Sequence, residues 1–314
     1  MKRTMRVQRA IFVILGFFAL LAPSSWAAKS DAGTSGAKFL RIGPGARPTA
    51  MGEAFSTVAG DLHNVYYNPA GLSSLKGSVI GGMHNQYFQG FGYDFMGYAA
   101  PVIKGRSGFG VSVYNLSVDG IERRTNDTDS DLGTFSATDF AYGLSYGHKV
   151  IDRLSLGANF KYVNQTLDTE KATAMSFDVG SRFEVPNRPV VLALGARHLG
   201  TQPKFRDVAS PLPSIYYGGA SIFLLDLLTV AAEVGMPRDQ ETLVSFGTEY
   251  NKMLPGDFAF AVRGGYNTAN TDPGGLAGAS FGAGMSYRRL TIDFAWVPFG
   301  DLGDTFRYSL QLKF

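Results

Sequence analysis

The C-terminal stretch Thr305-Phe306-Arg307-Tyr308-Ser309-Leu310-Gln311-Leu312-Lys313-Phe314 alternates polar and apolar side chains without a break. Successive side chains of a β-strand point to opposite faces, so all the aromatic and aliphatic groups of this segment share one face. An apolar face suits lipid, and a polar face suits a wet barrel interior. The stretch therefore predicts a strand of a transmembrane β-barrel that ends at the aromatic residue Phe314.

The same alternation recurs along the chain from residue 78 onward. For example, Tyr142, Leu144 and Tyr146 alternate with Gly143, Ser145 and Gly147. Segments of this kind begin near Ser78, Phe91, Ser107, Thr138, Arg153, Thr173, Pro189, Pro213, Leu228, Thr242, Asp257, Gly278, Leu290 and Asp304. An even strand number is typical of single-chain bacterial barrels. The predicted fold is all-β: an antiparallel transmembrane barrel of about fourteen strands.

The connections between these segments alternate in length. Short turns are expected at 104–105, 151–152, 186–188, 225–226, 254–256 and 288–289, and longer polar loops at 119–136, 168–172, 201–211, 237–241, 267–277 and 298–303. Outer-membrane barrels have short periplasmic turns and longer external loops, so both chain ends are expected on the periplasmic side. A soluble β-sandwich, the alternative, explains neither this alternation nor the terminal aromatic residue.

Composition narrows the class of protein. Hydrophobic residues make up 45% of the chain and charged residues only 18%, which is few charges for a soluble protein of 314 residues. The formal net charge of +3 is too small to form a nucleic-acid-binding stripe, so no nucleic acid partner is expected. The absence of Cys excludes disulfides, thiolate metal sites and a lipoprotein anchor.

The first 27 residues have the pattern of a secretory signal peptide. Four basic residues within residues 1–9 precede the apolar run 10–22, and Ser25-Trp26-Ala27 supplies small residues at the positions that a signal peptidase recognises. A transmembrane helix, the alternative, needs about 20 apolar residues to cross the membrane. We therefore expect export to the bacterial outer membrane, with residues 1–27 removed.

Residues 28–76 do not alternate and are predicted to form an N-terminal hatch, or plug, inside a barrel made of residues 77–314. Many inward positions of the predicted strands are Gly, which leaves volume for such a segment. These glycines are Gly143, Gly147, Gly157, Gly180, Gly195, Gly247, Gly265, Gly282 and Gly284. A disordered periplasmic tail is the alternative.

Two motifs in this segment carry a family resemblance. The stretch 36–55 contains Ala46-Arg47-Pro48-Thr49-Ala50-Met51-Gly52, and Asn68-Pro69-Ala70-Gly71-Leu72 follows it. Together they resemble the start of the PorV/PorQ family, which belongs to the FadL-like barrels. The resemblance implies a 14-stranded fold and a hatch motif of Arg47, Met51, Gly52, Asn68, Pro69, Ala70 and Gly71. By residue type, 68–71 is a plausible tight turn, with Pro fixing φ and Gly able to take a positive φ.

The charged residues predicted to face the barrel lumen are the remaining candidates for a site. They are Asp178, Arg182, Arg197, Glu233, Glu249, Arg263, Arg288, Asp293 and Arg307. Mixed charges on inward strands either pair with one another and with the plug, or line a path for a solute. Apolar residues near the loop bases form either an apolar vestibule or an interfacial girdle. They are Tyr87, Phe88, Phe91, Leu199, Pro211, Leu212, Pro298 and Phe299.

No enzyme is expected. Residues 143–147 and 278–282 match the G-x-S-x-G pattern, but both lie in alternating strands rather than at a strand-to-helix elbow. The four His residues have no metal-ligand spacing, and Asp127, Asp129 and Asp131 do not complete a calcium loop. Neither a catalytic residue, a cofactor nor a metal is predicted.

Two functional hypotheses remain open. The first is passive, FadL-like transport of hydrophobic small molecules past the hatch, which the family resemblance implies. The second is a PorV-like accessory role in protein secretion or surface assembly, with the external loops binding a translocated protein. The expected partners are outer-membrane lipid, the barrel-assembly machinery at Phe314, and either a hydrophobic ligand or a secreted protein.

Overall fold

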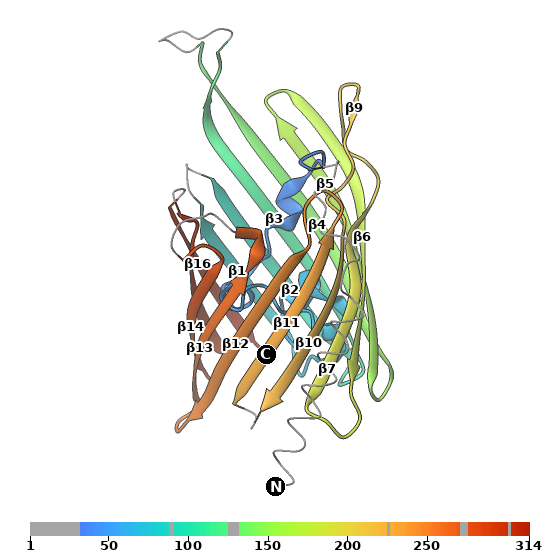
Figure 1. The fold of residues 1–314 in the computed structure, drawn as a ribbon, viewed down its shortest axis with the longest axis vertical. Helices are drawn as coiled ribbons and strands as arrows, with labels where there is room; N and C mark the ends of the chain where they lie inside the picture. The colour runs from blue at the N-terminus through green and yellow to red at the C-terminus, as the bar shows by residue number, and fades with distance from the viewer. Residues whose placement is uncertain (1–31, 88–90, 125–131, 225–226, 271–275, 301–302) are drawn as a thin grey trace.

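The computed structural model describes residues 32–87, 91–124, 132–224, 227–270, 276–300 and 303–314, and within them the chain forms a closed antiparallel barrel (Figure 1). Its fourteen strands confirm the predicted fold class. They are β1 (Val79–Gln86), β2 (Gly92–Ile103), β3 (Ser107–Glu122), β4 (Thr134–Ile151), β5 (Leu154–Leu167), β6 (Glu170–Glu184), β7 (Val190–Gly200), β10 (Ile215–Leu224), β11 (Leu228–Pro237), β12 (Leu243–Leu254), β13 (Phe258–Asn267), β14 (Ala279–Tyr287), β15 (Leu290–Pro298) and β16 (Asp304–Lys313). The predicted signal peptide lies outside the described residues.

Each strand pairs with its neighbours in the chain, and β1 pairs with β16 to close the barrel. The closing register places Val79 opposite Lys313, and the Phe314 N–H donates a hydrogen bond to the Ser78 carbonyl at 2.8 Å. The terminal strand therefore completes the barrel as predicted from its alternation.

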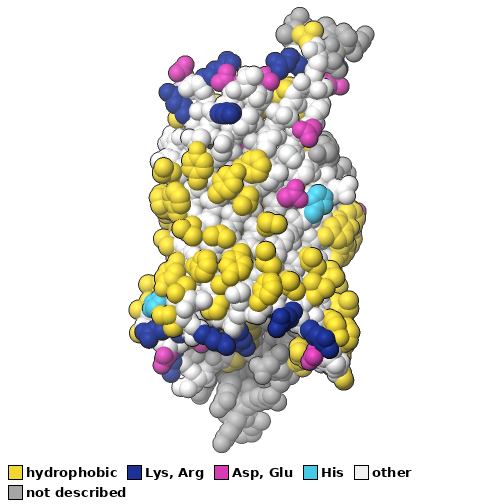
Figure 2. Space-filling view, turned by 180° about the vertical axis from the view of Figure 1, so that it is seen from behind, with side chains coloured by type: hydrophobic (Ala, Val, Ile, Leu, Met, Phe, Trp, Pro, Cys, Tyr) yellow, Lys and Arg dark blue, Asp and Glu magenta, His cyan; other side chains and the backbone are white. Residues whose placement is uncertain are grey.

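The alternation of β16 also defines the two sides of the wall. Tyr308 and Leu310 are each 52% exposed on the outside, whereas Arg307 and Ser309 are 3% exposed on the inside. Outward apolar side chains continue around the barrel and form a belt on the face shown in Figure 2. In the described residues no helix is both long and apolar enough to cross a membrane.

Strand starts were predicted within four residues, the largest difference being Thr134 instead of Thr138 for β4. Two predicted external loops are wrong. The loop predicted at 119–136 is shorter, because β3 ends at Glu122 and β4 begins at Thr134. The loop predicted at 168–172 is a two-residue turn before β6. Polar residues above a membrane can still pair as strands, so polarity alone misplaces the strand ends. The predicted loop at 201–211 contains a small hairpin of β8 (Lys204–Phe205) and β9 (Val208–Ala209).

Residues 32–76, here called the inner segment, pass through the barrel interior (Figure 1). The segment contains the short helices η1 (Lys38–Arg41), α2 (Ala46–Ala50), α3 (Asn64–Tyr67) and η2 (Pro69–Ser74). The α2 helix contacts β13 to β16, and η2 contacts β2 to β6 on the other side of the barrel. Most of its apolar side chains, including Phe55 and Leu72 at 0% exposure, belong to the largest core cluster.

Glycines on the inward face of the wall strands allow the inner segment to pack closely against the strands. A methyl group at Gly157 would lie 2.2 Å from the Ala70 nitrogen, and one at Gly265 would lie 2.0 Å from the Gly52 nitrogen. Six of the nine inward glycines named above meet the inner segment in this way: Gly147, Gly157, Gly180, Gly247, Gly265 and Gly282. The inner segment occupies the space that side chains at these positions would fill.

Candidate functional site

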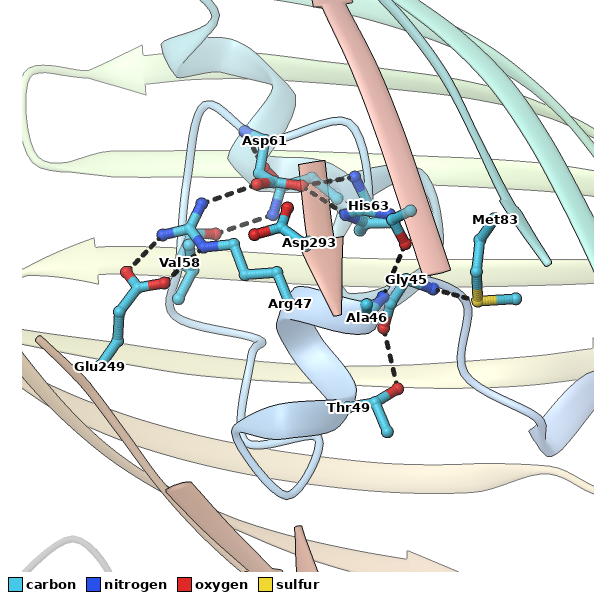
Figure 3. A network of polar contacts seen from close by, with 12 residues as sticks. Gly45, Ala46, Arg47, Thr49, Val58, Asp61, His63, Met83, Glu249 and Asp293 are labelled. Carbon is cyan, nitrogen blue, oxygen red and sulfur yellow. Dashed lines mark hydrogen bonds and ion pairs between the residues drawn. The ribbon is translucent and has the colours of Figure 1, made fainter. Parts of the chain in front are cut away.

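The α2 half of the inner segment is tied to the wall through Arg47 (Figure 3). Its guanidinium donates two hydrogen bonds to the Glu249 carboxylate, each 2.7 Å long, and a third of 2.7 Å to Asp61. Glu249 belongs to β12, whereas Asp61 lies further along the inner segment. A bidentate arginine–carboxylate pair fixes orientation as well as distance, so Arg47 holds α2 in one position.

The Arg47 contacts extend into a network of buried charges. Glu249 also accepts a 2.6 Å bond from Arg263, which in turn donates a 2.7 Å bond to Asp293. Glu249 on β12, Arg263 on β13 and Asp293 on β15 thus carry mutually compensating charges. Buried charges without such partners would be costly, so the network depends on α2 being in place.

Asp61 joins the two halves of the inner segment. It accepts bonds from the His63 backbone N–H at 2.9 Å and from Arg47, and its carboxylate lies 2.7 Å from the His63 ring nitrogen. Burial alone would raise the pKa of Asp61, but the contacts with His63 and Arg47 outweigh burial and lower it. Asp61 is therefore held ionised.

The predicted motif residues Met51 and Gly52 end α2 against the wall. Met51 is fully buried, and Gly52 has a φ of 60°. The Gly52 N–H donates to the Ser280 hydroxyl at 3.1 Å, and its carbonyl accepts from the Asn267 side chain at 3.1 Å. Glycine is required here because a side chain would collide with the backbone of two wall strands.

The second motif, 68–71, begins η2 rather than forming the predicted tight turn. Pro69 is its first residue, and the Asn68 side chain caps it by accepting a 3.1 Å bond from the Ala70 N–H. The Asn68 amide also donates to Ser56 O at 2.8 Å and to Ser181 O on β6 at 3.0 Å. Gly71 does not use a positive φ; it is needed because the Asn64 side chain occupies the place of a Cβ.

Besides Glu249, three predicted lumen charges form hydrogen bonds with the inner segment. Arg182 donates to Thr57 O at 2.9 Å, and Glu233 accepts from Ser56 N at 3.1 Å. Arg307 donates to Gly43 O at 2.8 Å and to the Thr49 hydroxyl. These contacts come from β6, β11 and β16, so several strands bind the segment.

The other predicted lumen charges pair within or beside the wall. Arg197 lies 3.5 Å from Glu233 and over the rings of three tyrosines, the nearest being Tyr217 at 4.8 Å. Asp178 forms a buried ion pair with Lys161 and accepts the His198 backbone N–H at 2.8 Å. The Asp178 carboxylate thereby replaces a backbone acceptor at a bulge, where β7 takes a positive φ at His198.

Arg288 was wrongly placed in the lumen. It lies at the turn between β14 and β15 with its side chain 68% exposed, 3.9 Å from Asp257. The alternation that assigns its face ends one residue earlier, at Tyr287, because the turn reverses the chain there. A period-two pattern has no meaning beyond the last paired residue.

Several charged residues of the interior were not predicted as part of the site. Arg41 pairs with Asp239 of an external loop, and Glu53 lies 3.8 Å from Arg307. Nothing local marks residues such as Asp61 or Glu53, because the inner segment lacks a repeating pattern. Lys161 could have been predicted from the sequence, because it lies on the inward face of an alternating strand.

A cavity of about 260 Å³ lies between the inner segment and the end of the barrel that carries the longer loops. The inner segment supplies its floor with Thr49, Gly52 and Glu53. Arg41, Arg197 and Arg307 line it from three different elements, and Tyr87 and Phe299, with ring centroids 5.9 Å apart, line it as well. Two of the residues named as vestibule or girdle therefore belong to a vestibule-like pocket.

The pocket combines apolar surface with donor groups. Ile42, Ile215, Leu243 and Val297 contribute aliphatic side chains. Among the residues that the structure describes, the buried nitrogens Arg41 Nη1, Arg197 Nε and Arg307 Nε have no hydrogen-bond partner. Burial raises the pKa of Glu53 more than Arg307 and Arg197 lower it, so its negative charge is disfavoured. The balance of the pocket therefore favours a ligand that accepts hydrogen bonds.

Comparison with protein families assigns the chain. The model of the "Uncharacterised protein family (UPF0164)" matches residues 19–179, just over half of the 314 residues. The chain belongs to the UPF0164 family. The matched residues of this UPF0164 protein include the inner segment, β1 to β5 and most of β6. No curated protein matches it in sequence.

Solved structures share the fold of this UPF0164 protein. The toluene transporter TodX of Pseudomonas putida is 12% identical, with a TM-score of 0.61 over 86% of this chain and 98% of that chain. The toluene transporter TbuX of Ralstonia pickettii is 14% identical, with a TM-score of 0.57 over 87% and 98%. A Pseudomonas aeruginosa FadL homologue is 13% identical, with a TM-score of 0.55 over 83% and 95%. At these identities the likeness establishes the FadL-like fold alone.

Proposed function

We propose that this UPF0164 protein is an outer-membrane channel for passive transport of hydrophobic small molecules, with the pocket as entry site and the inner segment as gate. The observation that carries the proposal is the 260 Å³ pocket directly above the inner segment, inside a barrel whose lumen that segment otherwise fills. Structural neighbours with this fold are toluene transporters and a FadL homologue.

The pocket chemistry refines the proposed substrate. Its aliphatic lining accommodates an apolar body, and its unpartnered arginine nitrogens accommodate an acceptor group at one end. The proposed substrate is therefore an amphipathic molecule with a small anionic or carbonyl group. In uptake into vesicles that contain the protein, a carboxylate is expected to compete better than the alcohol of the same chain length.

Two engineered disulfides test the gate. The native chain has no Cys, so introduced pairs have no competing thiols. Ala46→Cys with Ser309→Cys would fasten the pocket floor, where Ala46 N and Ser309 Oγ are 2.8 Å apart, and Ser73→Cys with Ser155→Cys would fasten η2, where the two hydroxyls are 2.9 Å apart. At least one oxidised pair is expected to stop uptake, and reduction is expected to restore it.

The control is a disulfide within the wall. Ser286→Cys with Thr291→Cys joins β14 to β15, whose side-chain oxygens are 2.9 Å apart, and should leave uptake unchanged. Undiminished uptake with both inner-segment disulfides formed would contradict gating by the inner segment. Absence of uptake by the unmodified protein, in vesicles shown to contain it, would contradict transport itself.

A second candidate function, a PorV-like role in secretion or surface assembly, is favoured by an external groove. The groove has a volume of about 420 Å³ and is lined by Phe135, Leu167 and Phe205 at the outer ends of three hairpins. Ion pairs Arg123–Asp168 and Arg206–Glu170 flank it. Substitution of Phe135 and Phe205 by Ser should impair surface assembly without changing uptake if this role holds.

A further inference from the structure

The end of the barrel that carries the short turns and the C-terminal residue Phe314, here called the turn end, has a marked excess of basic side chains. Ten basic residues of the described chain lie there, and we call them the basic belt: Lys76, Lys104, Arg106, Lys149, Arg153, Arg188, Lys252, Arg288, Arg289 and Lys313. The acidic side chains described at this end are three: Asp152, Glu184 and Asp257. Figure 2 shows a row of Lys and Arg side chains along the lower edge of the apolar belt.

The opposite end differs in charge balance and in pairing. Its described loops and strand ends carry six basic and eight acidic residues: Arg123, Arg124, Lys171, Lys204, Arg206 and Arg238, against Asp119, Glu122, Asp168, Glu170, Asp207, Asp239, Glu241 and Asp304. Four of those cations form ion pairs with acidic neighbours at 2.7–3.9 Å. Within the described residues, Lys104, Arg106, Arg153 and Arg289 of the basic belt form no ion pair.

The basic belt follows the circumference of the barrel. Its members come from the turns β2–β3, β4–β5, β6–β7, β12–β13 and β14–β15, and from both terminal strands or their flanks. A protein that docks on one side would need charge on that side alone. A distribution over five turns and both terminal strands, with no described basic residue at the β10–β11 turn, instead complements a ligand that surrounds the barrel, as the lipid annulus does.

The belt is also continuous with apolar surface. Ile103, Ile151 and Met253 are 54%, 59% and 72% exposed beside it, and Arg288 lies 5.2 Å over the Tyr287 ring. Long basic side chains beside an apolar surface extend their charged ends to the headgroup level of a bilayer. Such charges attract anionic lipids over roughly a Debye length.

We propose that the basic belt binds the phosphate groups of anionic phospholipids in the membrane leaflet at the turn end. The proposal rests on the membrane location given above but not on transport. The lipids would set the depth and orientation of the barrel, since the opposite end offers no comparable charge excess.

The test is the lipid selectivity of the full-length barrel. Wild type would be reconstituted in bilayers of phosphatidylglycerol and phosphatidylcholine, and the retained lipids counted by native mass spectrometry. The belt variant Lys104→Gln, Arg106→Gln, Arg153→Gln, Arg289→Gln should lower the retained ratio of phosphatidylglycerol to phosphatidylcholine by about threefold or more. Raised salt should lower the wild-type ratio in the same direction.

Two controls isolate the charge at this end. An outer-end variant, Lys171→Gln, Lys204→Gln, Arg206→Gln, Arg238→Gln, should keep the wild-type ratio. A charge-conserving variant, Lys104→Arg, Arg106→Lys, Arg153→Lys, Arg289→Lys, should keep it too and shows that the four positions tolerate substitution.

Equal retention of both lipids by an inserted wild-type barrel would overturn the proposal, as would a similar loss in the outer-end variant. A wild-type chain that stays out of the bilayers would overturn the membrane location itself, and the lipid site with it. A barrel that shows lipid selectivity but no uptake would contradict only the transport function.

Discussion

Gly52 shows how one residue without a side chain sets the fit of the inner segment. Its φ of 60° is unfavourable for other residues, and a methyl group there would lie 2.5 Å from Tyr266 O and 2.6 Å from Phe246 O. Gly52→Ala is expected to cost about 3 kcal/mol or more, because paired wall strands cannot move away. Urea unfolding in lipid vesicles, followed by the fluorescence of Trp296, measures this cost.

Gly105→Ala is the matched control. Gly105 has a similar φ of 71° but has nothing within 4 Å of the added methyl group. It should therefore show backbone strain alone, about 1–2 kcal/mol. Equal costs for the two substitutions would mean that the inner segment does not press against the wall at Gly52.

Arg47 forms buried ion pairs with both Asp61 and Glu249. Arg47→Ala leaves Glu249 with Arg263 and Asp61 with His63, so the expected loss of about 2–3 kcal/mol is below that for a buried charge with no partner left. Limited proteolysis of the inner segment should become faster in parallel. Arg123→Ala breaks an exposed pair instead and should cost less than about 1 kcal/mol.

At the scale of elements, η2 depends on the two hydrogen-bonding roles of Asn68. Asn68→Asp keeps the oxygen that caps Ala70 N but loses the amide that donates to Ser56 O and Ser181 O. A carboxylate facing two carbonyls is repelled, so we expect Asn68→Asp to destabilise the protein at least as much as Asn68→Ala, which loses both roles. Thermal unfolding of the two variants compares them; near-wild-type stability of Asn68→Asp would show that capping is what matters.

Strand elements were predictable because their signal is local. The alternation of β4, β5 and β16 is visible in consecutive residues, and a shift by one residue would turn apolar side chains inward. The strand ends were less predictable. Glu122 and Thr134 extend a hairpin with polar residues that resemble a loop, and Asp178 sits at a bulge that only the pairing of β6 with β7 creates.

At the scale of the whole molecule, Asp61 makes the stability of the packed interior pH-dependent. Its folded pKa lies below the unfolded value of about 3.9, so its contribution is complete above that pH and is lost as the pH falls toward the folded pKa. Acidification from pH 7 to about pH 3 should therefore lower the urea midpoint of wild type more than that of Asp61→Asn. Equal shifts would show that Asp61 does not contribute to acid sensitivity.

The sequence by itself determined the wall. Period-two alternation is a property of neighbouring residues, so it specified the strands, the face of most side chains within them and the inward glycines that leave room for the inner segment. The lack of alternation in residues 28–76 indicated a plug rather than further strands, and the two motifs in it carried the family resemblance.

Only the tertiary structure decided what the interior does with its charges. Arg47 and Glu249 are 202 positions apart, and Arg41 meets Asp239 across 198. The pocket likewise needs a floor from residues 49–53 and walls from strands that close around it. Such contacts depend on barrel closure and on the path of a segment without periodicity, and neither is encoded in the spacing of adjacent residues.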